Sequence, residues 1–165
     1  MLKITKSKKV ESKTGSIYLA SDHAGYVLKE ELKSYLFKEY DFDIVDCGAY
    51  KLIPNDDYTD YMHTCASNLS ADIAEDVDSI AFVFGGSGEG EAMVMNRYAG
   101  VRCTTYYGGN LHIVELGRQH NNANSLSFGA RFVDLEECLA AAHIFLSTRF
   151  EGGRHKDRVE GIEIK

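Results

Sequence analysis

The sequence has no tryptophan, a single proline (Pro54) and no long apolar run. No stretch approaches the roughly 20 apolar residues that a membrane-spanning helix needs, which argues against an integral membrane protein. Of its 165 residues, 44% are hydrophobic and 26% are charged, as in an ordinary globular protein. This length favours one domain that can bury a substantial core.

Cysteine is scarce and scattered, with four residues at positions 47, 65, 103 and 138. None forms a C-x-x-C pair, so the spacing predicts neither a zinc site nor a disulfide framework. We interpret these cysteines as small buried side chains in a reducing compartment. The net charge of −7 argues against a nucleic-acid-binding or anionic-membrane surface, although the segment RFEGGRHKDR (149–158) is locally basic.

The N-terminal segment MLKITKSKKVESKTG is rich in lysine but lacks the apolar stretch of a secretory signal. We expect residues 1–15 to be a flexible basic extension and residues 16–165 to form a single domain. With no targeting signal recognised, the expected location is the cytoplasm.

Apolar runs alternate with segments of helical periodicity along the chain. The expected strands are 16–22, 42–48, 79–86, 101–107 and 125–131. The expected helices are 25–40, 58–75, 89–98, 109–120 and 134–148, the fourth of them interrupted or ended near Gly117. Five such units with short connections predict an α/β fold, a five-stranded parallel sheet with helices on both faces. The tail after Arg149 has room for one more helix, which would reach a partner subunit.

Polar residues and glycines gather where the predicted strands end. The segment from Ser21 to Gly25 follows the first strand, GGSGEGE (85–91) follows the third, and Arg131 ends the fifth. Because ligands of such sheets bind beyond the carboxyl ends of the strands, we expect the site at this edge.

The segment GGSGEGE combines a glycine-rich turn with two carboxylates, Glu89 and Glu91. Such a turn presents backbone N–H groups to an anion, but flanking carboxylates would repel a phosphate. The arrangement suits a transient oxyanion, with a glutamate as the base that removes a proton from carbon. The alternative is a structural turn whose glutamates only favour the start of a helix. A dinucleotide site is disfavoured because its glycine motif would follow the first strand, and Asp46 alone is a weak ribose signal.

The adjacent residues Asp22 and His23 are a further candidate for proton transfer. Asp22 and His23 form a pair that can move protons near neutral pH, or else Asp22 only caps a helix with His23 packed beside it. His63, His112 and His143 lie in helical patterns and are interpreted as surface or packing residues.

A basic cluster lies near the end of the chain. Arg154 and Arg158 would share a helix face and, with Arg131, suggest an anionic group on the ligand. The alternative is a solvated basic tail. Together these features indicate a small phosphorylated ligand and proton transfer at carbon without a cofactor, as in aldose–ketose isomerisation through an enediolate.

Between Ile17 and Glu160 the sequence resembles the ribose-5-phosphate isomerase B family, with its related galactose-6-phosphate isomerase subunits. The resemblance rests on several motifs in the order of the family: SDHAGYVLK, DYTDY, GGSGEGEAMVMNRYAGVR, RQHNNAN, SFGAR and EGGRHKDRV. It implies a three-layer Rossmann-like fold, a homodimer or tetramer with sites between subunits, and no metal or nucleotide cofactor. The implied reaction interconverts ribose 5-phosphate and ribulose 5-phosphate in the pentose phosphate pathway.

The resemblance also implies roles for individual residues. Asp22 and His120 are the expected ring-opening proton carriers, and Asn121 accompanies His120. The expected enediolate cradle consists of Ser87 and the backbone of Gly86, Gly88 and Gly90. The expected phosphate ligands are Arg131, Arg154 and Arg158, and the expected pocket-lining residues are His23 and Tyr58.

Two departures from the family pattern bear on the chemistry. Many members use a cysteine as the base, in a pattern like C-G-T-G, where this chain has Gly85. Another branch has G-G-S-G-x-G-E and uses the final glutamate, so Glu91 is the expected base, and Glu89 at the x position contacts either substrate or solvent. Thr59 replaces the proline that usually follows the tyrosine.

Two alternative functions stay open at the level of sequence. One is isomerisation of another aldose phosphate, such as galactose 6-phosphate, allose 6-phosphate or a tetrose phosphate, a choice that depends on pocket size. The other is a non-catalytic sugar-phosphate-binding protein, which is disfavoured because Glu91, Asp22 and His120 are all present.

Overall fold

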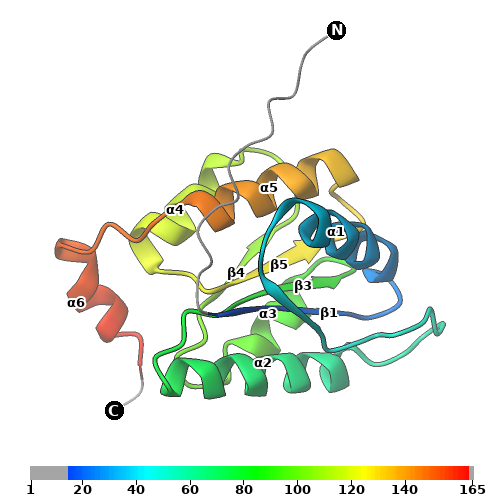
Figure 1. The fold of residues 1–165 in the computed structure, drawn as a ribbon, viewed down its shortest axis with the longest axis horizontal. Helices are drawn as coiled ribbons and strands as arrows, with labels where there is room; N and C mark the ends of the chain where they lie inside the picture. The colour runs from blue at the N-terminus through cyan, green and yellow to red at the C-terminus, as the bar shows by residue number, and fades with distance from the viewer. Residues whose placement is uncertain (1–14, 164–165) are drawn as a thin grey trace, which may run out of the picture.

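Five parallel strands run side by side through the middle of the molecule (Figure 1). The structure, a computed structural model, describes residues 15–163, and residues 1–14 and 164–165 lie outside the described part. The strand order across the sheet is β2-β1-β3-β5-β4, and neighbouring strands are parallel. The strands are β1 (Ser16–Ser21), β2 (Asp43–Asp46), β3 (Ile80–Gly85), β4 (Cys103–Tyr106) and β5 (Ser125–Gly129).

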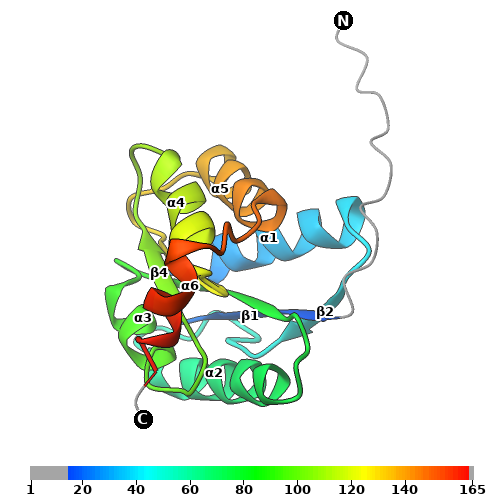
Figure 2. The ribbon, with the colours of Figure 1, turned by 90° about the vertical axis from the view of Figure 1, so that its left-hand side faces the viewer.

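Helices cover both faces of this sheet (Figures 1 and 2). One face carries α1 (Tyr26–Glu39), α4 (His112–Asn121) and α5 (Leu135–Ser147). The other carries α2 (Tyr58–Ala74) and α3 (Glu89–Met95). The short helix α6 (Arg154–Glu160) lies beside α4 at the end of the sheet where the strands begin, which faces the viewer in Figure 2. The three-layer α/β fold expected from the sequence is confirmed.

Alternation of side chains along the strands builds a core on each face of the sheet. In β3, Ile80, Phe82 and Phe84 join the cluster beneath α1, α4 and α5, whereas Ala81 and Val83 join the cluster beneath α2 and α3. A strand buried on both faces therefore reads as one continuous apolar run, which is how β3 was recognisable in the sequence.

The expected elements are present, with one error inside α4. The helix continues through Gly117 to Asn121 and ends at Asn122, which has a left-handed φ of 47°. Gly117 is buried, and a Cβ there would lie 3.4 Å from Thr104 Oγ1 on β4. We conclude that this glycine allows close approach of the helix to the sheet and does not break the helix.

The structure also bears on the expectations about the cysteines, the N-terminal segment and membrane-spanning helices. All four cysteines are free, and burial raises the pKa of the Cys138 thiol to about 12. Residues 1–14 of the expected extension lie outside the described residues, and Gly15 is buried. Among the described residues, no helix has the length and apolar character needed to cross a bilayer.

Candidate active site

Asp22 lies directly beyond the carboxyl end of β1 and is buried. Its Oδ1 atom accepts hydrogen bonds from the backbone N–H groups of Ala24 (2.9 Å) and Gly25 (3.1 Å). These bonds fix the carboxylate in the turn before α1; the N-cap of α1 is Gly25 and has no side-chain cap, so Asp22 does not cap the helix. Its position at the carboxyl end also leaves it available for the predicted proton transfer.

Glu91 projects from the first turn of α3 into the carboxyl end of the sheet and is only 4% exposed. Its carboxylate lies against the Cα of Gly85, where any Cβ would collide with it. Burial raises the pKa of Glu91, and the nearby charge of Asp22 acts in the same direction. A carboxylate with a raised pKa is a better proton acceptor, as the role of base requires.

The loop between β3 and α3 is held close to β5. Gly88 has a φ of +79°, and a Cβ there would lie 2.9 Å from the backbone carbon of Phe128. Ser127 Oγ donates a 2.6 Å hydrogen bond to the carbonyl oxygen of Gly88. Only glycine fits position 88. The neighbouring Ser87 is exposed.

Two of the predicted ligand-binding side chains flank this loop. A Cβ on Gly86 would lie 3.1 Å from Arg131 Cζ, and the backbone N–H of Arg131 donates to the carbonyl of Gly86 (3.2 Å). A Cβ on Gly90 would lie 2.7 Å from the hydroxyl oxygen of Tyr58. The glycines therefore allow Arg131 and Tyr58 to approach the loop backbone closely.

His23 is held by a residue that the sequence analysis missed, Asp56. Asp56 Oδ1 lies 2.8 Å from both the backbone nitrogen and Nδ1 of His23, whereas Asp22 Oδ2 is 3.7 Å from Nδ1. The predicted partner, Asp22, is thus the more distant carboxylate. Asp56 lies in an irregular loop, and the only available signal was its place beside the DYTDY motif.

Asp46 is unsuited to the ribose contact of a dinucleotide site. Its carboxylate binds Nζ of Lys29 (2.7 Å) and Nζ of Lys33 (2.6 Å) and accepts from the backbone of Gly48 (3.0 Å). Lys29 is fully buried, and its Nζ also donates to the carbonyl of Ala49 (2.8 Å). This network stabilises the loop after β2 and occupies the carboxylate.

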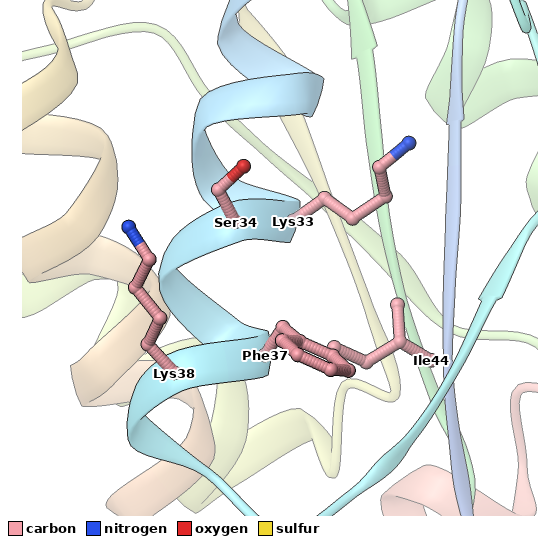
Figure 3. A pocket seen from close by; sticks show the side chains of 5 residues that line it. All are labelled: Lys33, Ser34, Phe37, Lys38 and Ile44. Carbon is pink, nitrogen blue, oxygen red and sulfur yellow. The ribbon is translucent and has the colours of Figure 1, made fainter.

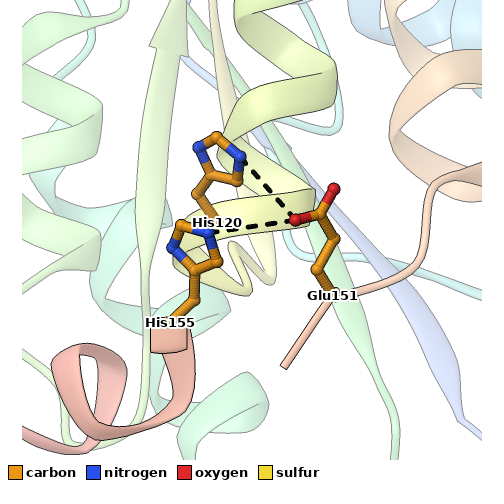
Figure 4. A group of neighbouring side chains, drawn as sticks. All are labelled: His120, Glu151 and His155. Atoms are coloured by element: carbon orange, nitrogen blue, oxygen red, sulfur yellow. Dashed lines mark ion pairs between the residues drawn. The ribbon is translucent and has the colours of Figure 1, made fainter. Parts of the chain in front are cut away.

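The other predicted residues lie at the end of α4 and on α6. The rings of His120 and His155 stack with centroids 4.2 Å apart and planes 6° apart (Figure 4). Glu151 Oε2 lies 3.9 Å from His120 Nε2 and 3.8 Å from His155 Nε2. Burial lowers the pKa of His155, and His120, Arg154 and Arg158 reinforce the effect. A cavity of about 380 Å³ here is lined by His120, Asn121, His155, Arg158, Val159 and Ile162.

These residues do not meet Glu91 within one chain. Asn121 ends α4 just before β5 begins at Ser125, whereas Gly85, against which Glu91 lies, pairs with Gly129 at the opposite end of β5. From Ser125 to Gly129 the strand advances four steps of about 3.3 Å, so roughly 13 Å separate the two ends of β5. The predicted site residues of one copy therefore fall into two predicted half-sites, one at the carboxyl end and one at the amino end of the strands.

Two kinds of feature could hold other ligands: clusters of metal-ligand side chains and a groove beside α1. The described residues include two groups with metal-ligand side chains, Asp22–His23–Asp56 and His120–Glu151–His155. In the first, the histidine already pairs with a carboxylate at hydrogen-bonding distance. A groove of about 350 Å³ beside α1 and β2, lined by Lys33, Ser34, Phe37, Lys38 and Ile44, contains none of the predicted site residues (Figure 3).

Known proteins resemble this chain over nearly its whole length. Residues 17–162 match the family described as Ribose/Galactose Isomerase. Ribose-5-phosphate isomerase B of Mycolicibacterium paratuberculosis is 34% identical over 145 residues, covering 87% of each chain. The Escherichia coli (strain K12) protein of that name is 34% identical over 149 residues, covering 88% of this chain and 93% of its own.

A solved structure also resembles this chain over most of its length. Ribose-5-phosphate isomerase B from Mycoplasma genitalium, with bound ribulose-5-phosphate, superposes with a TM-score of 0.84 at 32% sequence identity. The match covers 92% of this chain and 95% of that one. With the sequence match over residues 17–162, this likeness shows that the chain belongs to the ribose/galactose isomerase family.

Proposed function

We propose that this protein interconverts ribose 5-phosphate and ribulose 5-phosphate through an enediolate, without a cofactor. The observation that carries the proposal is Glu91, a buried carboxylate of raised pKa at the carboxyl end of β3. The relatives named ribose-5-phosphate isomerase B, and the bound ribulose-5-phosphate of one solved relative, support this substrate.

In the proposed mechanism, Asp22 and His120 move the protons that open the sugar ring. Glu91 then removes the proton from C2 and returns it to C1 while the hydroxyl proton of O2 passes to O1, so the reaction conserves atoms and needs no external oxidant. The enediolate oxygen is stabilised by Ser87 and the backbone of the glycine-rich loop. Donors aimed at such a developing charge are typically worth about 10²–10³ in rate each.

We propose that each site is shared between two copies of the chain in a homodimer, or in a tetramer of paired dimers. The proposal is supported by the roughly 13 Å of β5 that separate the two predicted half-sites within one copy. In a two-fold dimer the contact is self-complementary, so His120 of the partner subunit reaches Glu91 and the arrangement repeats at a second site. Asn121 of the partner subunit accompanies His120.

Phosphate binding is assigned to arginines from both half-sites. Arg131 lies beside the glycine-rich loop and is exposed. Arg154 and Arg158, one helical turn apart on α6, are also exposed and would come from the partner subunit. His23 and Tyr58 line the pocket between these groups. Guanidinium groups suit this role because they remain charged and donate paired hydrogen bonds to phosphate oxygens.

We also propose that residues 16–165 form a single domain and that the protein acts in the cytoplasm. The four free cysteines support a reducing compartment.

The test is to incubate the protein with ribose 5-phosphate in D₂O and follow the products by NMR without added metal or cofactor. We expect ribulose 5-phosphate to form and deuterium to appear at C2 of the ribose 5-phosphate pool. Absence of both conversion and exchange would reject ribose 5-phosphate as substrate. A parallel panel of galactose 6-phosphate, allose 6-phosphate and a tetrose phosphate would show whether another aldose phosphate is preferred.

A further inference from the structure

We propose that Asp56 is a positioning residue that holds His23 with Nδ1–H directed into the protein and Nε2 directed to the substrate. The inference rests on the proposed function, because it assigns His23 a contact with the sugar phosphate. It adds a residue outside the motifs that carried the family resemblance.

The geometry around Asp56 is specific to this role. A single atom, Asp56 Oδ1, lies 2.8 Å from the backbone nitrogen of His23 and 2.8 Å from its ring Nδ1. The two donors belong to one residue, so they fix both the backbone and the ring of His23 relative to the carboxylate. The Asp56 side chain is only 7% exposed, and its other oxygen, Oδ2, is buried without a hydrogen-bond partner among the described residues. Burial and the neighbouring Asp56 carboxylate raise the pKa of the Tyr61 hydroxyl, so Asp56 lies next to Tyr61 as well as His23.

The contact has a chemical consequence for the imidazole ring. In a neutral histidine only one ring nitrogen carries hydrogen, and a carboxylate at hydrogen-bonding distance favours hydrogen on the nitrogen that faces it. Asp56 therefore selects the Nδ1–H form and leaves Nε2 to the ligand. The His23 side chain is 31% exposed, which leaves the ring accessible from the site.

Asp22 does not provide the same orientation, although it is the sequence neighbour of His23. Its Oδ1 is occupied by the N–H groups of Ala24 and Gly25, and its Oδ2 lies 3.7 Å from His23 Nδ1, beyond hydrogen-bonding distance. The two carboxylates are thus divided in function. Asp22 remains the proposed proton carrier, and Asp56 acts through His23.

The experiment compares the wild-type protein with Asp56→Ala and Asp56→Asn. Asp56→Asn retains one oxygen that can accept from both donors, removes the charge and replaces the second oxygen by an NH2 group. The matched controls are Asp57→Ala and Asp57→Asn, because Asp57 is the next residue, is exposed and contacts no part of His23 that the structure describes. Two readouts are used: ¹⁵N shifts of the His23 ring, recorded about two pH units above the ordinary histidine pKa of ~6.5, and the steady-state kinetics with ribose 5-phosphate.

We expect the wild-type ring to be in the Nδ1–H form and Asp56→Ala to shift it toward Nε2–H. Asp56→Ala should raise KM for ribose 5-phosphate about tenfold while kcat changes less than about threefold, and Asp56→Asn should keep the Nδ1–H form with a smaller rise in KM. The Asp57 variants should match the wild-type protein in both readouts.

A wild-type ring in the Nε2–H form would overturn the proposal, as would an Asp56→Asn variant that folds but loses the Nδ1–H form. An unchanged KM in a folded Asp56→Ala variant would also overturn it. These results are distinct from failure of the proposed function, because inactivity of the wild-type protein toward ribose 5-phosphate would leave the ring form measurable.

Discussion

The two ends of the sheet are built differently. At the carboxyl end, the fully buried Lys29 lies 2.7 Å from Asp46, and Asp56 lies 2.8 Å from His23. At the amino end, the ion pairs of Glu151 with His120 and His155 are 3.9 and 3.8 Å long, and Glu151 is 52% exposed. The contacts of Lys29 and Asp56 at the carboxyl end are thus short and buried, whereas the Glu151 ion pairs at the amino end are long and Glu151 is exposed.

This difference fits the proposal that each site combines residues from two copies of the chain. The base and its glycine-rich loop need burial and fixed geometry, which the sheet and α3 supply. In the proposed shared site, His120 and the α6 arginines reach a substrate bound mainly by the other copy, which the exposure of Arg154 and Arg158 and the partial exposure of His120 allow. Changes at the carboxyl end should therefore affect both chemistry and stability, and changes at the amino end mainly substrate binding and turnover.

The largest effect is expected for Glu91→Gln. This change removes the proposed base from the carboxyl end and should lower kcat by roughly 10³-fold, because an amide does not accept the C2 proton. Substrate binding, measured by calorimetry with ribose 5-phosphate, should be retained. The matched control is Glu89→Gln, two residues earlier and exposed, which should stay close to wild-type activity. Near-normal turnover by Glu91→Gln would remove Glu91 from the mechanism.

The next effect concerns stability at the carboxyl end. Lys29→Ala should lower the free energy of unfolding by about 3 kcal/mol, because it takes one member from a buried network with Asp46 and Glu30. Lys33→Ala is the control, since Lys33 contacts the same carboxylates but is 30% exposed, and it should cost less than about 1 kcal/mol. Urea denaturation measures both, and equal losses would contradict the buried-network interpretation.

At the amino end, Arg154→Ala should raise KM for ribose 5-phosphate by about 10- to 100-fold, the equivalent of one charge-assisted contact to phosphate. The fold should be unaffected because Arg154 is exposed on α6. Lys156→Ala, on the same helix and 69% exposed at its side chain, serves as a control for the loss of positive charge. An unchanged KM for Arg154→Ala would mean that α6 is a solvated surface helix.

The smallest expected effect is a higher stability of the Glu91→Gln variant at neutral pH. Burial raises the pKa of Glu91 in the folded state, so its contribution is favourable below the ordinary glutamate pKa of ~4.3 and is lost as the pH rises through the folded value. At neutral pH, Glu91→Gln should therefore have a higher Tm than the wild-type protein. Each 1 kcal/mol corresponds to roughly 2–4 °C in a domain of this size.

The gain in Tm from Glu91→Gln should shrink as the pH is lowered from the raised folded pKa toward ~4.3 and should be absent below that value, where the wild-type carboxyl is protonated in both the folded and the unfolded state. A Tm difference that grows on acidification would have the wrong sign and would contradict the raised pKa.

Much of the fold was predictable because periodicity and strand-end glycines reflect local physics. The five strands and the helices of both faces follow from the sequence. The predicted interruption at Gly117 was wrong because a glycine can serve close packing as well as a turn. That choice depends on Thr104, which is distant in sequence.

The positions of the predicted site residues in the fold could be anticipated from the strands that they follow or precede. Asp22, Glu91 and Arg131 follow strands and therefore lie at the carboxyl end, as expected. His120 precedes β5, and its position before a strand was the signal that it lies at the other end. Asp56 gave no periodic signal because it lies in an irregular loop, and its role depends on a tertiary contact with His23.

The division of the site between two copies is tested most directly by mixing two inactive variants, Glu91→Gln and His120→Asn, under conditions that exchange subunits. If each site combines the carboxyl end of one copy with the amino end of another, half of the mixed dimers are heterodimers with one intact site. We therefore predict recovery of about a quarter of wild-type activity from an equal mixture. A mixture that exchanges subunits yet stays as inactive as its components would show that both residues act within one chain, and would contradict the shared site.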